Sequence, residues 1–174
     1  MNMKLKMEFY SQSKGVGYMV LKVKKLHEEA IIPTRGSEQA AGLDLYACSI
    51  NSDGVPVSNY IIPRGETVSI PTGIAVEIPE GYWGLLALRS SMAFKRNFYI
   101  PNGLGVIDSD YRGEIKVAVS FNASSYLSDS FRTIQAGDRI GQLILVPLPK
   151  FEIELVNELS NTIRGEGGFG STGK

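Results

Sequence analysis

Short apolar segments separated by closely spaced turn-forming residues run along most of this chain. In residues 21–26, Leu21 and Val23 fall on one face and Lys22 and Lys24 on the other, which is the two-residue period of a half-buried strand. Similar alternating or β-branched segments recur at residues 42–48, 59–62, 67–78, 83–88, 114–121, 131–134, 139–146 and 151–156. Gly, Pro, Asp and Asn residues stand between them. The pattern therefore predicts many short strands.

Helical periodicity is confined to one turn near residues 91–95. Many strands without an alternating helix favour an all-β fold, a jelly roll or barrel. The 174 residues, 43% of them hydrophobic, suit one domain with an adequate core. We expect a mobile leader at residues 1–20, a β domain at residues 21–160 and a glycine-rich end at residues 161–174.

The charge balance excludes a global electrostatic attraction to polyanions. Eighteen basic and eighteen acidic residues cancel, so we expect neither a nucleic acid nor an anionic membrane as partner. No apolar run is long enough to span a membrane, and residues 1–20 lack the apolar core of a signal peptide. Cys48 is the only cysteine and His27 the only histidine, which excludes an internal disulfide and a His/Cys zinc site. A reducing compartment follows, the cytoplasm or, in a eukaryotic host, the nucleus.

Two segments combine charged or hydroxyl side chains with predicted strands. In residues 41–47, Asp44 lies on a strand between apolar neighbours, where a carboxylate needs a partner. Arg89, Ser90 and Ser91 follow the end of another strand. A guanidinium fork beside two hydroxyls suits phosphate oxygens, although a solvated turn is the simpler alternative.

Residues 102–115 are more specific. Two predicted strands flank a turn rich in Gly, Asp and Tyr, which predicts a β-hairpin whose glycines permit close approach by a ligand. Backbone amides and Asn102 could there read the edge of a base. Asp108 follows the apolar pair Val106 and Ile107, a position where burial could hold a carboxylate as a general base. The alternative is a turn-forming aspartate.

The end of the chain, residues 164–174, holds five glycines with one aromatic ring, Phe169. Consecutive amides of such a segment can curl around an anion, and the ring could stack on a flat base. A frayed terminus is the alternative.

Five segments, in order along the chain, closely resemble the motifs of the trimeric, all-β dUTPase family: AGLDLYA, RSS, NGLGVIDSDYRGEI, GDRIGQLI and RGEGGFGSTG. They lie within residues 41–173. The resemblance implies a distorted jelly-roll or β-barrel domain, a homotrimer with active sites shared between subunits, and Mg²⁺-assisted hydrolysis of dUTP to dUMP and pyrophosphate. That reaction keeps uracil out of DNA and supplies dUMP for dTMP synthesis.

The resemblance also implies a role for each motif residue. Asp108 would orient and deprotonate the attacking water, and Tyr111 would pack on the deoxyribose and exclude a ribose 2′-hydroxyl. Uracil would be bound by Asn102, Gly105, Val106 and Ile107, with the tight backbone at Gly105 rejecting the methyl group of thymine. The phosphates would be held by Arg89, Ser90, Ser91 and Gln142. Residues 161–174 would form a lid that closes through Arg164, Phe169, Gly170, Ser171 and Thr172.

Magnesium in this family is carried by the triphosphate and ordered waters, so no protein ligand is implied. Asp44 would support the water shell of the ion, or else hold Arg139 in place. Two other functions on the same fold stay open. A dCTP deaminase would need a glutamate near Ala118, where residues 117–119 are Val, Ala and Val. A non-catalytic nucleotide-binding regulator would not need Asp108.

Overall fold

The structure, a computed structural model, describes residues 19–122 and 130–168. Most of the proposed leader, the loop 123–129 and residues 169–174 lie outside this range. Within it, the elements are β1 (Lys22–Lys25), β2 (Thr34–Arg35), β3 (Leu43–Tyr46), β4 (Asn59–Pro63), β5 (Thr67–Glu77), β6 (Tyr82–Leu88), α1 (Ser90–Arg96), β7 (Phe98–Tyr99), β8 (Gly105–Ile107), β9 (Glu114–Phe121), β10 (Phe131–Gln135) and β11 (Arg139–Pro147).

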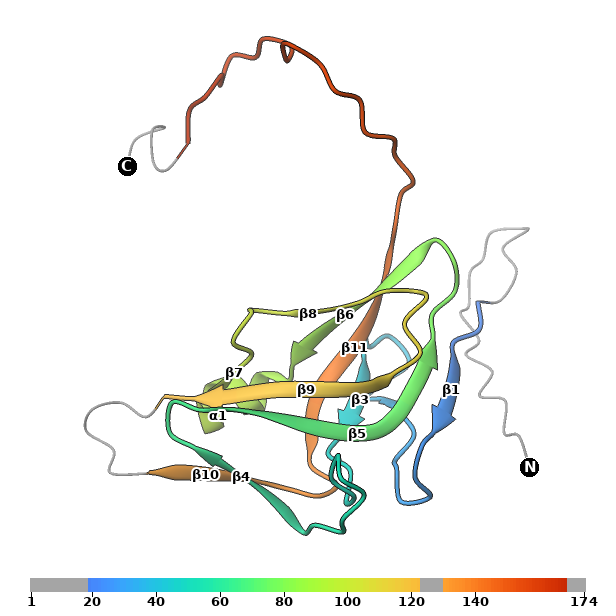
Figure 1. The fold of residues 1–174 in the computed structure, drawn as a ribbon, viewed down its shortest axis with the longest axis vertical. Coiled ribbons are helices and arrows are strands. Elements are labelled where there is room, and N and C mark those ends of the chain that lie inside the picture. The colour runs from blue at the N-terminus through green and yellow to red at the C-terminus, as the bar shows by residue number, and fades with distance from the viewer. Residues whose placement is uncertain (1–18, 123–129, 169–174) are drawn as a thin grey trace.

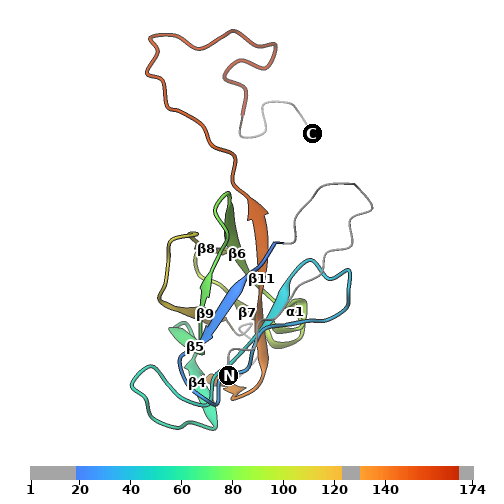
Figure 2. The same cartoon turned by 90° about the vertical axis from the view of Figure 1, so that its right-hand side faces the viewer.

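Two antiparallel sheets form the body of the molecule. One has the order β1-β5-β9-β7 and the other β2-β3-β11-β6-β8, while β4 and β10 pair separately. In Figure 1 the β5–β9 pair crosses in front of β3 and β11, and Figure 2 shows the molecule from the side. Inward-facing apolar residues of both sheets, such as Val117 of β9 and Leu143 of β11, belong to one core. The predicted all-β, single-domain fold is confirmed. No helix of the described residues is long and apolar enough to cross a membrane.

Eight of the nine predicted strands are present, and the predicted helical turn is α1. The prediction of a strand at residues 151–156 is wrong. This segment leaves β11 and runs away from the body (Figures 1 and 2). Phe151, Ile153 and Leu155 are 78%, 92% and 98% exposed. Their alternation suits a strand, but no described strand of the same chain lies beside them to supply a ladder.

A bulge in β5 shapes the neighbouring strand β9. Pro71 pairs with Lys116, whereas Ala75 pairs with Glu114, so the extra residues lie in β5. The backbone N–H of Gly73 donates to Glu114 Oε1 at 2.8 Å, which replaces a bond of the interrupted ladder. Gly73 has a φ of 68°, a conformation that favours glycine.

Candidate active site

Neighbouring strands of the five-stranded sheet bring three of the motifs together. β11 lies between β3 and β6. Asp44 of β3 pairs with Gln142 of β11, which in turn pairs with Ala87 of β6, two residues before Arg89. Residues almost a hundred positions apart in the chain therefore share one patch of the sheet.

A second bulge places Arg139 on the same face as Asp44. Tyr46 pairs with Arg139 and Leu45 with Gly141, so Ile140 is an extra residue in β11. Without the bulge, Ile140 would lie opposite Tyr46, on the face that Tyr46 shares with Asp44. The bulge instead buries Ile140 completely and turns Arg139 toward the carboxylate.

Asp44 binds two arginines. Arg89 Nε lies 3.0 Å from Asp44 Oδ1, and Arg139 Nη1 lies 3.3 Å from Oδ2. The side chain of Asp44 is 11% exposed, so the two cations offset the cost of taking its charge out of water. Gln142 Nε2 donates to the carbonyl of Leu88 at 3.5 Å. We call Asp44, Arg89, Arg139 and Gln142 the arginine cluster.

Ser90 and Ser91 lie next to this cluster. Arg89 has the extended backbone of a residue that precedes a helix, and Ser90 begins α1. The first turn of α1 holds no acidic residue. Arg89 and the two serines are therefore consecutive residues where β6 ends, and the first turn of α1 adds no carboxylate that would repel an anion.

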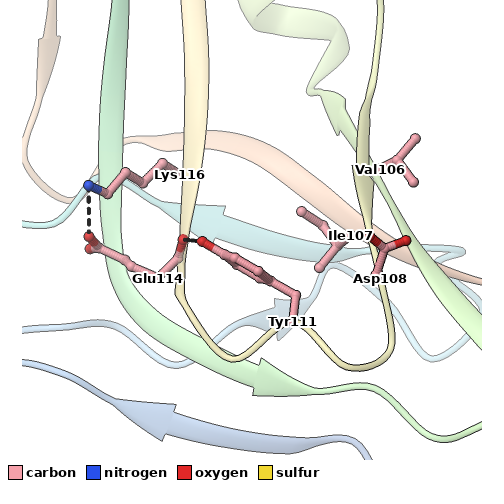
Figure 3. Close-up of a pocket in the computed structure, with 6 residues that line it drawn as sticks. All are labelled: Val106, Ile107, Asp108, Tyr111, Glu114 and Lys116. Atoms are coloured by element: carbon pink, nitrogen blue, oxygen red, sulfur yellow. Dashed lines mark hydrogen bonds and ion pairs between the residues drawn. The ribbon is translucent and has the colours of Figure 1, made fainter.

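The predicted β-hairpin at residues 102–115 is wrong in its pairing. β8 pairs with β6, whereas β9 pairs with β5 and β7, so the two strands belong to different sheets. The turn between them joins the sheets. An open pocket of about 220 Å³ lies between the strands, as Figure 3 shows, and it is lined by Val106, Ile107, Asp108, Tyr111, Glu114 and Lys116.

Hydrogen bonds within the turn hold Tyr111 between the two strands (Figure 3). The backbone N–H of Tyr111 donates to the carbonyl of Asp108 at 3.2 Å, and its hydroxyl donates to the carbonyl of Glu114 at 3.2 Å. Arg112 Nη1 donates to the carbonyls of Ser109 and Tyr111 at 2.7 and 3.0 Å. The turn is thus held by its own side chains.

The surroundings of Asp108, Asn102 and Gly105 differ in part from those predicted for this turn. Asp108 lines the pocket but is exposed, so the burial expected around it is not present within one chain. Asn102 is exposed and is not among the pocket-lining residues. A Cβ on Gly105 would lie 2.9 Å from Leu86 Cβ, so packing of β8 on β6 already requires this glycine.

Sequence reasoning missed Glu114 and Lys116 as pocket residues. Lys116 Nζ lies 3.6 Å from Glu114 Oε2 and donates to Ser52 Oγ at 3.0 Å. Their two-residue spacing on β9 does place both on one face. That spacing alone does not identify the face that a pocket would occupy.

The pocket and the arginine cluster lie far apart in a single chain. Asp44 lies three strands from β8, and through its pairing with Gln142 it is level with Ala87 of β6. Asp108 follows Ile107, which pairs with Gly84, so it lies about four residues farther along the sheet. With strands about 4.8 Å apart and a rise of about 3.4 Å per residue, the two aspartates are separated by about 20 Å.

Of the residues through which the predicted lid would close, the structure describes Arg164 alone, and Arg164 is not among the residues that line the pocket. Arg164 is exposed, and its Nε donates to the carbonyl of Gly167 at 2.7 Å. Phe169, Gly170, Ser171 and Thr172 lie outside the described residues. No group of three or more His, Cys, Asp or Glu side chains that could hold a metal ion occurs among the residues that the structure describes.

The fold is all-β, and its arginine cluster beside two serines and its small pocket beside a carboxylate and an aromatic ring suit a protein of the phosphate-binding, nucleotide-recognising class. The family model described as dUTPase matches residues 28–173, and the chain belongs to this family.

Relatives and solved structures agree with this family assignment. A deoxyuridine 5′-triphosphate nucleotidohydrolase of Hydrogenobaculum is 44% identical over 156 residues, covering 89% of this chain and 99% of that protein. A mutant dUTPase of Staphylococcus bacteriophage 80alpha with dUpNHpp superposes with a TM-score of 0.76 at 29% identity, covering 89% of this chain and 99% of that one. A mutant dUTPase from phage phi11 of S. aureus, whose structure concerns the coordination of a structural Mg(II) ion, has a TM-score of 0.66 at 30% identity, covering 80% and 97%.

Proposed function

We propose that this protein is a dUTP nucleotidohydrolase, which converts dUTP to dUMP and pyrophosphate in the cytoplasm, or in the nucleus of a eukaryotic host. The observation that carries the proposal is the pocket between β8 and β9, where a carboxylate, Asp108, lies beside an aromatic ring, Tyr111. The names of the relatives support this choice of substrate. The reaction would keep uracil out of DNA and supply dUMP for dTMP synthesis.

The pocket suits a nucleoside. β8 is the edge strand of its sheet, with β6 as its ladder partner among the described strands. The other edge of Gly105, Val106 and Ile107 therefore presents backbone N–H and C=O groups, which can pair with the edge of uracil. Asn102 adds a side-chain amide at the start of this segment. Tyr111 packs on the deoxyribose and leaves no room for a 2′-hydroxyl.

Asp108 acts as the general base. It orients a water molecule toward the α-phosphorus and accepts a proton from it. The water oxygen then bonds to the α-phosphorus, and the bond from that phosphorus to the bridging oxygen breaks. Pyrophosphate leaves with the electron pair of that bond.

The arginine cluster binds the phosphates together with Ser90 and Ser91. Arg89 supplies charge and hydrogen bonds, and Gln142 supplies an amide. The ion pairs of Asp44 with Arg89 and Arg139 support a positioning role for Asp44, because they fix both guanidinium groups on one face of the sheet.

Magnesium fits this chemistry as an ion that arrives on the triphosphate. Asp44 is already bound to two arginines, and the described residues form no cage of acidic side chains. Such an ion neutralises phosphate charge. Asp44 could in addition accept a hydrogen bond from a water of the ion, which is the alternative to a purely positioning role.

A homotrimer with shared active sites accounts for the separation of the two half-sites. The base and the α-phosphate of one nucleotide are joined by a single deoxyribose, which cannot bridge about 20 Å from the pocket to the arginine cluster of the same chain. The pocket of one subunit would therefore face the cluster of another. The exposed apolar side chains of Phe151, Ile153 and Leu155 suit burial on a further copy. The lid formed by Arg164, Phe169, Gly170, Ser171 and Thr172 would close over the site.

A product assay tests the function. The purified protein with dUTP and Mg²⁺ should release dUMP and pyrophosphate, and Asp108→Asn should abolish hydrolysis while retaining affinity for dUTP. Ammonia released from dCTP would instead identify a deaminase. Binding of dUTP without hydrolysis by the unmodified protein would identify a regulator, and unchanged hydrolysis by Asp108→Asn would refute the assignment of the base.

A further inference from the structure

Gly113 needs to be a glycine for an unusual reason. It is not among the residues with positive φ, so its backbone would accept any side chain. A Cβ built on it would nevertheless lie 2.3 Å from the hydroxyl oxygen of Tyr111, 2.5 Å from Cζ and 2.9 Å from Cε2. These three closest atoms all belong to one side chain. The space above Gly113 is therefore filled by the ring of Tyr111.

The ring of Tyr111 is held at one end and open along the rest. Its hydroxyl donates to the carbonyl of Glu114, and the Glu114 carboxylate accepts a hydrogen bond from Gly73 at the bulge of β5. The tyrosine side of the pocket is thus tied to the β5–β9 sheet. The residue as a whole is 45% exposed, and it lines the pocket (Figure 3). The absent Cβ of Gly113 allows the ring to lie this close to its own turn.

We infer that Gly113 determines the selection of deoxyribose over ribose by fixing the position of the Tyr111 ring. The inference rests on the proposed function, in which this ring packs on the sugar. A methyl group at residue 113 needs an ordinary contact of about 3.4 Å or more, so the hydroxyl end of the ring must move by about 1 Å. That movement breaks the bond to Glu114 and frees the ring, which then no longer defines the space beside the 2′-carbon.

The variant Gly113→Ala tests this inference, with Gly36→Ala as its matched control. Gly36 also lacks a positive φ, and nothing lies within 4 Å of a Cβ built on it. We expect Gly113→Ala to lower the ratio of kcat/KM for dUTP to kcat/KM for UTP by at least about tenfold. The ratio of the Kd values for UMP and dUMP, which does not depend on catalysis, should fall in parallel. Gly36→Ala should leave both ratios unchanged.

A double-mutant cycle separates an action through the ring from a general structural effect. Tyr111→Ala alone should lose the discrimination, and adding Gly113→Ala to it should produce no further change. A further loss in the double variant would overturn the inference, as would an unchanged dUTP/UTP ratio in Gly113→Ala.

Failure of Gly113→Ala to fold would also overturn the inference, since the glycine would then serve the fold instead of one half-exposed ring. Thermal melting and oligomer mass of both variants report on this. If the unmodified protein does not hydrolyse dUTP, the proposed function fails. If it does hydrolyse dUTP but Gly113→Ala leaves the ratio of kcat/KM for dUTP to kcat/KM for UTP unchanged, only this inference fails.

Discussion

Replacement of Asp44 by asparagine tests the arginine cluster most directly, because it keeps the shape of the side chain and removes its charge. A hydrogen bond to a charged group contributes about 1.5–3 kcal/mol. Arg89, with a side chain 29% exposed, is expected near the lower end of that range. Arg139 is 48% exposed and adds about 0.5 kcal/mol. The two together amount to about 2 kcal/mol.

If these ion pairs hold the guanidinium groups for the phosphates, the same free energy is lost from the transition state. A loss of about 2 kcal/mol corresponds to a decrease in kcat/KM of about 30-fold. Steady-state kinetics with dUTP over a series of Mg²⁺ concentrations measures it. We expect the decrease to be equal at every Mg²⁺ concentration, and Asp53→Asn, at an exposed loop position, should have no effect.

Two results would refute this reasoning. Recovery of Asp44→Asn activity at high Mg²⁺ would show that Asp44 acts on the hydrated ion. A kcat/KM within twofold of the unmodified protein would show that the ion pairs do not position the arginines. Adding Arg89→Ala to Asp44→Asn should cost less than the sum of the single effects, since the two residues act as one unit.

Three further predictions concern stability and assembly. Gly73→Ala should lower the free energy of unfolding by at least about 1 kcal/mol more than Gly54→Ala. Both glycines have positive φ, but only at Gly73 would a Cβ meet another side chain, 2.7 Å from Cys48 Sγ. Equal denaturation midpoints of the two variants would contradict this. Burial raises the pKa of Tyr60 to about 12 from 10, so its contribution to stability is complete below pH 10 and is lost as the pH rises to about 12. The stability of Tyr60→Phe should therefore decline less than that of the unmodified protein between these values in pH-dependent denaturation, and parallel curves would count against the shift. Deletion of residues 164–174 should collapse dUTP turnover while light scattering still gives the trimer mass; near-normal turnover would exclude the lid.

Local patterns predicted most of the strands because each depends on a few neighbouring side chains. β9 begins and ends where the alternation of residues 114–121 predicts, since Ile115, Val117 and Val119 need a common buried face. The same alternation at residues 151–156 predicted a strand that the single chain does not form. Alternation shows that a segment has an apolar face, but it does not show what covers that face.

The motif residues themselves could also be found from sequence, but their grouping could not. Asp44 was expected to need a partner, and the structure supplies two arginines, one from the end of β6 and one from β11. Sequence reasoning left the contact with Arg139 as one of two alternatives. It did not anticipate the contact with Arg89, which depends on β11 lying between β3 and β6.

By itself, the sequence determined the strand-rich fold, the chemical types of the site residues and the family to which they correspond. Tertiary structure alone decided that β8 and β9 separate into different sheets and leave a pocket between them. It also decided that a bulge at Ile140 turns Arg139 toward Asp44. Register and bulges arise from pairing between distant strands, in which a shift of one residue reverses the face that each side chain occupies.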